Sequence, residues 1–356
     1  MVKILENEEE ILQKIIDISE VCKNNKDEII KARFVQNIFF EYGIKDVKID
    51  PVGNVIGKIE GSVEESLVIF ADLNNIYSKK CKVTMRDIVG KGVATVSYPL
   101  FSLGEIAKLY LKERNIKFNL IIVGLTGGEK DFKGMEFFLE NNDEKIKGVI
   151  YLKGAEEGRI EKSTTSSLKA ELVVKNVQNN YLSRNKRSSI IVKISKLISK
   201  ISDEEQVDQY NIYVESVEKA NEEYEKYIVK LNLTGNTLNE VFEGKKLIEE
   251  IVAGLTNEDG IIIESRFFYG REGIKSIKDG LYNVYFEMLK QKGFKIFSLN
   301  ENSAITLPIE NSIDTVCIGI GKGGNLGMEN EYIEIKSIYR GIEIIYEGLQ
   351  QFEKEN

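Results

Sequence analysis

The N-terminal part of the chain alternates between segments with helical and with strand-like spacing of hydrophobic residues. Apolar side chains recur every three or four residues, as on one face of a helix, in 8–23, 27–42, 100–114 and 133–141. Uninterrupted apolar runs, which are typical of strands covered on both faces, occupy 66–73, 118–125 and 147–152. Strands that alternate with helices predict an α/β domain with a mainly parallel central sheet.

This pattern changes near residue 164, where a smaller block begins with the half-exposed strand pattern of 166–176. Further elements of the block are predicted at 190–201 and 237–253 (helices) and at 227–235 and 260–268 (strands), with a polar connection at 202–226. Patterns of the first kind resume at 275–292, 315–321 and 337–352. We therefore predict a larger domain formed by 1–163 and 272–356, and an inserted α+β domain formed by 164–271.

Composition restricts the chemistry that this chain can perform. It contains no histidine, which excludes Ser-His-Asp and Cys-His catalysis and histidine metal ligands. Its 57 acidic and 49 basic residues give a net charge of −8, which disfavours nucleic acid as a partner. Three separated cysteines fit a reducing compartment, and no apolar run reaches the roughly 18–20 residues of a membrane span. We therefore expect a cytoplasmic protein that binds neither nucleic acid nor membrane.

Short motifs follow one another in an order that is more informative than any of them alone. They are DPVGNVIGKIEG (50–61), ADLNN (71–75), VGKGVAT (89–95), LTGGEKDFKG (125–134), LKG (152–154), EEGRIEKS (156–163) and GIGKGGNLGMENEYIEI (319–335). In this order they resemble the co-catalytic zinc exopeptidases and deacylases that include peptidase T and acetylornithine deacetylase, and the peptidase T-like branch is most similar. The resemblance covers nearly the whole chain and is strongest at 53–61 and 330–343.

The resemblance implies a zinc-peptidase-like α/β/α core with an inserted lid domain, which in the family often mediates dimerisation. It also implies a two-metal centre of histidine and carboxylate ligands, with a separate glutamate as the base. The metal-binding positions fall on Asp72, Asn74, Thr95 (Ala94 if the register shifts by one), Glu129, Lys153 and Gly327, a set that we name the former metal cleft. The position of the base falls on Gly128.

Most of these residues cannot perform the chemistry of the family. A two-zinc centre needs about five or six nitrogen and oxygen ligands from the protein. Here Gly128 removes the base, and the ammonium of Lys153 would repel a divalent cation. The interpretation is a non-catalytic homologue, with no catalytic residue and no metal or other cofactor. We expect Lys153 to lie in salt-bridge range of Asp72, Glu129 or both, in place of the metal.

Such a protein would act by binding a peptide, a small molecule or a protein partner, and a homodimer through 166–202 is expected from the resemblance. The first alternative is a peptidase or N-acyl amino acid deacylase with a histidine-free, oxygen-only site for zinc or another divalent metal. Its ligands would be Asp72, Glu129 and Glu156, with Asn74 as a further candidate. The second alternative is a purely structural subunit of an assembly.

Overall fold

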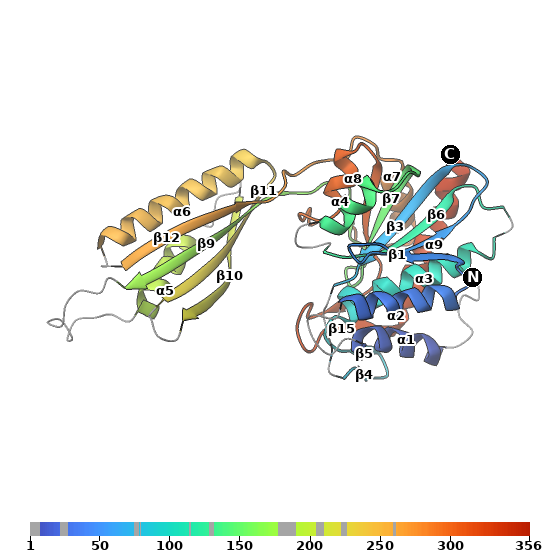
Figure 1. Ribbon diagram of the computed structural model, residues 1–356, viewed down its shortest axis with the longest axis horizontal. Coiled ribbons are helices and arrows are strands. Elements are labelled where there is room, and N and C mark those ends of the chain that lie inside the picture. Colours follow the sequence, from blue (N-terminus) through green and yellow to red (C-terminus); the bar gives the residue numbers. More distant parts are fainter. Residues whose placement is uncertain are drawn as a thin grey trace. The chain divides into compact units, whose positions relative to one another are not determined.

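The computed structural model describes residues 8–21, 28–74, 78, 80–113, 115–127, 132–176, 190–203, 210–221, 226–258 and 261–356 (Figure 1). The chain divides into two compact units, Met1–Lys162 with Lys275–Asn356, and Ser163–Ile274. Each unit buries a hydrophobic core of its own. The division lies close to the one expected from the sequence, while the role of the inserted unit as a lid stays a prediction.

The larger unit is built on a seven-stranded sheet in the order β1-β2-β6-β3-β7-β13-β8. These strands are β1 (Asp46–Ile49), β2 (Val55–Ile59), β3 (Glu65–Asp72), β6 (Asn119–Leu125), β7 (Lys145–Lys153), β8 (Ile160–Glu161) and β13 (Asp314–Gly319). The central strands β6, β3, β7 and β13 are parallel, and the outer pairs are antiparallel. Every residue of β6 and β13 is buried, as expected of strands covered on both faces. The predicted α/β fold class is confirmed.

Helices pack on this sheet through stripes of apolar residues. They are α1 (Glu8–Glu20), α2 (Glu28–Glu41), α3 (Tyr98–Tyr110), α4 (Lys133–Glu140), α7 (Gly280–Gln291), α8 (Thr306–Glu310) and α9 (Ile335–Glu355). In α9 the buried Ile338, Ile342, Ile345 and Leu349 recur at helical spacing. Helix α2 contacts β1 and β2, α3 contacts β3 and β6, and α7 contacts β13 and α9. Within the described residues, none of the helices combines the length and the apolar character that crossing a membrane would require.

A second, small sheet in the larger unit was not predicted. It has the order β14-β15-β5-β4, with β4 (Lys82–Val83), β5 (Asp87–Val89), β14 (Gly323–Gly324) and β15 (Tyr332–Glu334). Strands this short carry too few residues to show an alternating pattern. The pairing of β15 with β5 places the VGKGVAT and GIGKGGNLGMENEYIEI motifs side by side.

The inserted unit has a four-stranded antiparallel sheet in the order β10-β11-β9-β12. Its elements are β9 (Ser166–Asn176), α5 (Ile190–Asp203), β10 (Tyr210–Asn221), β11 (Lys226–Gly235), α6 (Leu238–Glu258) and β12 (Ile261–Tyr269). The sequence prediction was wrong at β10, which lies inside the segment expected to be a polar connection. Because β10 is an edge strand, many of its side chains are exposed, and the alternation of apolar residues at Tyr210, Ile212 and Val214 does not continue through its charged second half.

Candidate functional site

Two residues of the former metal cleft stand at the ends of neighbouring parallel strands. In the pairing of β3 with β7, Phe70 lies opposite Tyr151. Asp72 and Lys153 each follow this pair by two residues, so both project from the same face of the sheet at its carboxyl edge. Ligands of open α/β sheets bind at this edge.

A tyrosine that the sequence analysis did not single out connects these two residues. The Tyr151 hydroxyl donates a hydrogen bond to Oδ2 of Asp72, whose side chain is buried. The Tyr151 ring stacks on Phe70 with its centroid 4.4 Å away, and the Lys153 Nζ lies 4.9 Å from the centre of the Tyr151 ring. The signal was present in the sequence, because Tyr151 precedes Lys153 by two residues on a predicted strand. Gly128 and Glu129 lie outside the described residues, so the predicted ion pair of Lys153 with Asp72 or Glu129 stays a prediction.

A buried lysine from α2 reaches Asn74. The Lys31 Nζ donates to the backbone carbonyl oxygen of Asn74 over 2.9 Å, and Lys31 is fully buried. Together with Lys153, a second ammonium group therefore lies near the end of β3. Lys31 could not be found from the sequence, since it stands in a helix whose apolar pattern accounts for the segment.

Thr95 and Gly327 meet at the carboxylate of Glu331, which is fully buried. Oε1 of Glu331 accepts hydrogen bonds from the backbone N–H of Ala94 (2.9 Å), the backbone N–H of Thr95 (2.8 Å) and the Thr95 hydroxyl (3.0 Å). Oε2 accepts from the backbone N–H groups of Gly92 (3.0 Å) and Gly327 (2.9 Å). The Glu331 carboxylate thus joins the segment of Thr95 to the segment of Gly327.

Glu331 also caps a short π-helix, η1 (Val93–Ser97), which leads into α3. A negative charge at the start of a helix is favoured by the unpaired N–H groups and the helix dipole. The end of β7 packs tightly against η1, because a Cβ atom on Gly154 would stand 1.6 Å from the carbonyl oxygen of Ala94. Lys153 is therefore adjacent to the η1 segment that carries Thr95.

Asn54 of the DPVGN motif connects two residues of the LTGGEKDFKG motif, Thr126 and Gly134. Asn54 is fully buried, its Oδ1 accepts from the backbone N–H of Thr126 (2.9 Å), and its Nδ2 donates to the Gly134 carbonyl oxygen (2.9 Å). Asp50 orients Asn54 by accepting from its Nδ2 (2.7 Å) and its backbone N–H (2.8 Å). Two motifs that carried the resemblance are therefore in direct contact.

Glu156, a ligand in the alternative metal site, is engaged elsewhere. Its carboxylate pairs with the guanidinium of Arg159, which is buried and also forms two 2.9 Å hydrogen bonds to the carboxylate of Glu161. The nearby Cys317 is opposite Glu161 in the pairing of β13 with β8. Burial raises the pKa of Cys317 to about 12, although the charge of Arg159 lowers it. Its thiol is therefore protonated at neutral pH and is no nucleophile.

The described residues do not fit a two-zinc centre. In the part of the chain that the structure describes, no three histidine, cysteine, aspartate or glutamate side chains are grouped so that they could hold a metal ion. Of the former metal positions, Thr95 and Gly327 bind Glu331, Lys153 is cationic, and Asp72 accepts from Tyr151. A threonine, a glycine and a lysine supply none of the imidazole and carboxylate donors that zinc prefers.

Comparison with known proteins defines the class of the fold. No protein-family model and no curated protein sequence matches the chain. Solved structures of peptidases and amidases do match, and the chain shares their fold. The predicted resemblance to this group is confirmed at the level of the fold, and it includes the inserted unit because the matches cover nearly the whole chain.

The particular neighbours are peptidases. A tripeptidase from Staphylococcus aureus matches with a TM-score of 0.78 and 14% identity, covering 98% of this chain and 99% of that chain. Aminopeptidase PepT from Bacillus cereus matches with a TM-score of 0.73 and 14% identity, covering 98% and 99%. The YXEP protein of Bacillus subtilis, a dinuclear metal-binding peptidase from the M20 family, matches with a TM-score of 0.64 and 13% identity, covering 97% and 98%.

Proposed function

We propose that this chain is a non-catalytic homologue of the peptidase T-like zinc peptidases, which acts by binding a peptide, a small molecule or a protein partner. The observation that carries the proposal is the set of residues at the former metal positions. Lys153 stands in place of a carboxylate ligand, and Thr95 and Gly327 offer neither a carboxylate nor an imidazole to a metal.

Electrostatics supports this proposal. At a separation of 4 Å and an effective dielectric constant of 20, an ammonium group repels a cation by roughly 4 kcal/mol for each unit of the ion's charge. A divalent ion beside Lys153 would therefore face a strong penalty. The carboxylates of Asp72 and Glu331, which are buried, and of Glu156, which is half-buried, already accept hydrogen bonds from Tyr151, backbone amides and Arg159.

The site remains suited to binding. It lies at the carboxyl edge of parallel strands, where the ends of β3 and β7 and the start of η1 present polar and charged groups. Lys153 would attract a carboxylate, such as the terminus of a peptide. A homodimer through the inserted unit and a location in the cytoplasm belong to the same proposal.

The proposal is tested by incubating protein purified without chelator with a panel of dipeptides and tripeptides, with and without added zinc or manganese. We expect stoichiometric peptide binding in calorimetry but no hydrolysis under either condition. Metal-dependent turnover that disappears in Asp72→Asn would overturn the proposal and favour the histidine-free metallohydrolase.

A matched pair of variants locates the binding. Lys153→Met should weaken peptide binding by about tenfold, which corresponds to about 1.4 kcal/mol. Lys145→Met removes a lysine from the opposite end of the same strand, where its side chain is 75% exposed, and should have no effect. Equal affinities of both variants and of the unaltered protein would remove peptide binding from the strand-end site.

A further inference from the structure

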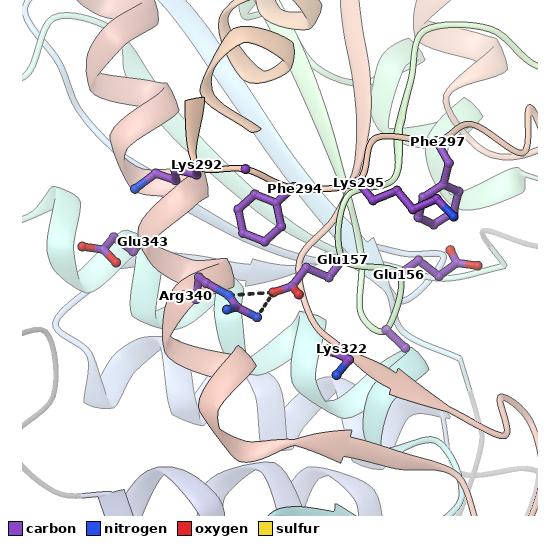
Figure 2. Close-up of a pocket in the computed structure, with 11 residues that line it drawn as sticks. Glu156, Glu157, Lys292, Phe294, Lys295, Phe297, Lys322, Arg340 and Glu343 are labelled. Carbon is purple, nitrogen blue, oxygen red and sulfur yellow. Dashed lines mark hydrogen bonds and ion pairs between the residues drawn. The ribbon is translucent and has the colours of Figure 1, made fainter. Parts of the chain in front are cut away.

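A pocket of about 750 Å³ opens in the larger unit, apart from the former metal cleft (Figure 2). Its walls come from the 155–157 segment, the 292–297 segment, Lys322 and the first half of α9. None of the described residues of the former metal cleft lines it. A space of this volume accommodates a small organic ligand.

Three residues that line the pocket, Phe294, Arg340 and Glu157, contact one another. The guanidinium carbon of Arg340 lies 5.3 Å from the centre of the Phe294 ring. Nε of Arg340 donates to Oε1 of Glu157 over 2.7 Å, and the Glu157 side chain is only 14% exposed. Because these three groups hold one another in place, a ligand meets a prearranged surface with an apolar ring at its centre.

Most charges around the pocket are already compensated. Lys292 pairs with Glu347 over 2.8 Å, and Lys322 pairs with Glu334 over 2.7 Å. Glu156 likewise forms an ion pair with the guanidinium of Arg159. These pairs leave little net charge to attract a simple anion or a simple cation.

Two residues of opposite charge that line the pocket, Lys295 and Glu343, could pair with charged groups of a ligand. Neither Lys295 nor Glu343 forms an ion pair with any residue that the structure describes. Figure 2 shows them on opposite sides of Phe294, with Glu343 on α9 and Lys295 on the 292–297 segment. A ligand with a single charge would pair with only one of these two residues and leave the other without a partner from the ligand.

We propose that this pocket binds a short peptide with free termini. Its terminal carboxylate would pair with Lys295, its terminal ammonium with Glu343, and an apolar side chain between them would pack on Phe294. An extended peptide separates its terminal charges by roughly 3.3–3.6 Å per residue, whereas the two charges of a single amino acid are adjacent, so two charged groups on opposite sides of a ring favour the peptide. This inference does not depend on peptide binding at the former metal cleft.

The probe is alanyl-phenylalanyl-alanine, titrated calorimetrically into the full chain beside its N-acetylated form and its C-terminal amide. We expect saturable binding of the free tripeptide and roughly tenfold weaker binding of each blocked form. Lys295→Gln should bind the C-terminal amide as tightly as the free tripeptide, because it lacks the ammonium group that pairs with the terminal carboxylate. Glu343→Gln should bind the N-acetylated form as tightly as the free tripeptide, because it lacks the carboxylate that pairs with the terminal ammonium.

Two controls make the result decisive. Lys246→Gln and Glu243→Gln remove an exposed ion pair of α6 and should bind the tripeptide like the unaltered protein. The inference is overturned if the tripeptide fails to bind at up to about 10 mM, a concentration that detects millimolar affinity. It is also overturned if Lys295→Gln and Glu343→Gln bind every form normally, or if Lys153→Met abolishes binding, which would assign the peptide to the former metal cleft.

Discussion

Glu331 is the residue on which Thr95 and Gly327 converge, and its side chain is fully buried. Glu331→Ala leaves several buried backbone N–H groups without an acceptor, each of which costs about 1–3 kcal/mol when unsatisfied. We expect urea unfolding to show a loss of about 3 kcal/mol or more. The control Glu329→Ala, whose side chain is 81% exposed, should change stability by less than about 0.5 kcal/mol. Similar losses in both variants would contradict the capping role of Glu331.

The buried carboxyl group of Asp314 makes the free energy of unfolding depend on pH. Burial raises its pKa above the ordinary value of 3.8, although its Oδ2 accepts from the backbone N–H of Leu281 over 3.0 Å. A raised pKa in the folded state means that the protonated form favours folding. Its contribution is therefore fully present below pH 3.8 and is lost as the pH rises through the folded-state pKa.

Asp314→Asn keeps the acceptor and removes the buried charge. We expect this variant to raise the free energy of unfolding at pH 7 by about 1 kcal/mol and to lose this advantage below about pH 3. Urea unfolding between pH 3 and pH 7 measures both values. Asp46→Asn, an exposed substitution, should leave stability unchanged at both pH values. If Asp314→Asn raises the free energy of unfolding equally at pH 7 and at pH 3, the buried charge of Asp314 is not the cause of the stabilisation.

At this scale the sequence predicted part of the site. Asp72 and Lys153 were expected at adjacent strand ends because each ends an apolar run, and the strand register places them there. The role of Glu331 was not predicted, since its partner Gly92 is 239 residues away in the chain. A pattern of neighbouring residues does not indicate a contact between residues that are far apart in the chain. Lys31 was not predicted because the apolar pattern of its helix already accounts for the segment, and its partner Asn74 is 43 residues away.

Among the elements, the close approach of β7 and η1 depends on a residue without a side chain. A Cβ at position 154 would lie 1.6 Å from the carbonyl oxygen of Ala94, and backbone cannot move away without disturbing η1. We expect Gly154→Ala to lower the unfolding free energy by more than about 3 kcal/mol, measured by urea unfolding.

Gly254→Ala is the matched control for that substitution. Gly254 lies in α6 and has no atom within 4 Å of its would-be Cβ. Alanine is a better helix former than glycine by about 1 kcal/mol, so this variant should be equal or more stable. The tight packing of η1 on β7 would be refuted if Gly154→Ala were as well tolerated.

Elements were predictable where hydrophobic spacing dominates. The buried strands β3, β6 and β7 and the amphipathic α9 follow the sequence pattern closely, because burial on two faces or on one stripe leaves a clear period. Strand β10 was missed because an edge strand exposes its polar residues. Helix α7 begins at Gly280, later than predicted, where Asp314 accepts the N–H of its first turn.

For the whole molecule, the two separate cores predict independent folding. The core of Ser163–Ile274 includes residues of β9, β11, α5 and α6 and draws on no residue of the larger unit. Expressed alone, this segment should unfold cooperatively on heating, with a circular dichroism spectrum of mixed helix and strand. The absence of a cooperative transition would show that the inserted unit depends on the rest of the chain.

The overall fold was predictable because it rested on the order of many motifs rather than on any catalytic residue. Asn54 illustrates this, since the DPVGN motif that carries it has a structural role in joining Thr126 to Gly134. The identity of a ligand was not predictable, because the positions that would recognise one carry no shared pattern. Loss of metal binding is accordingly the central claim about the molecule.

Thermal unfolding in the presence of EDTA and of zinc tests that claim most directly. A metal that binds only the folded protein stabilises it by mass action, by about 2.7 kcal/mol at one hundred times its Kd. We predict that EDTA leaves the Tm unchanged and that stoichiometric zinc causes no saturable rise. A zinc-dependent increase in Tm that saturates at stoichiometric metal and is reversed by EDTA would contradict the loss of the metal centre.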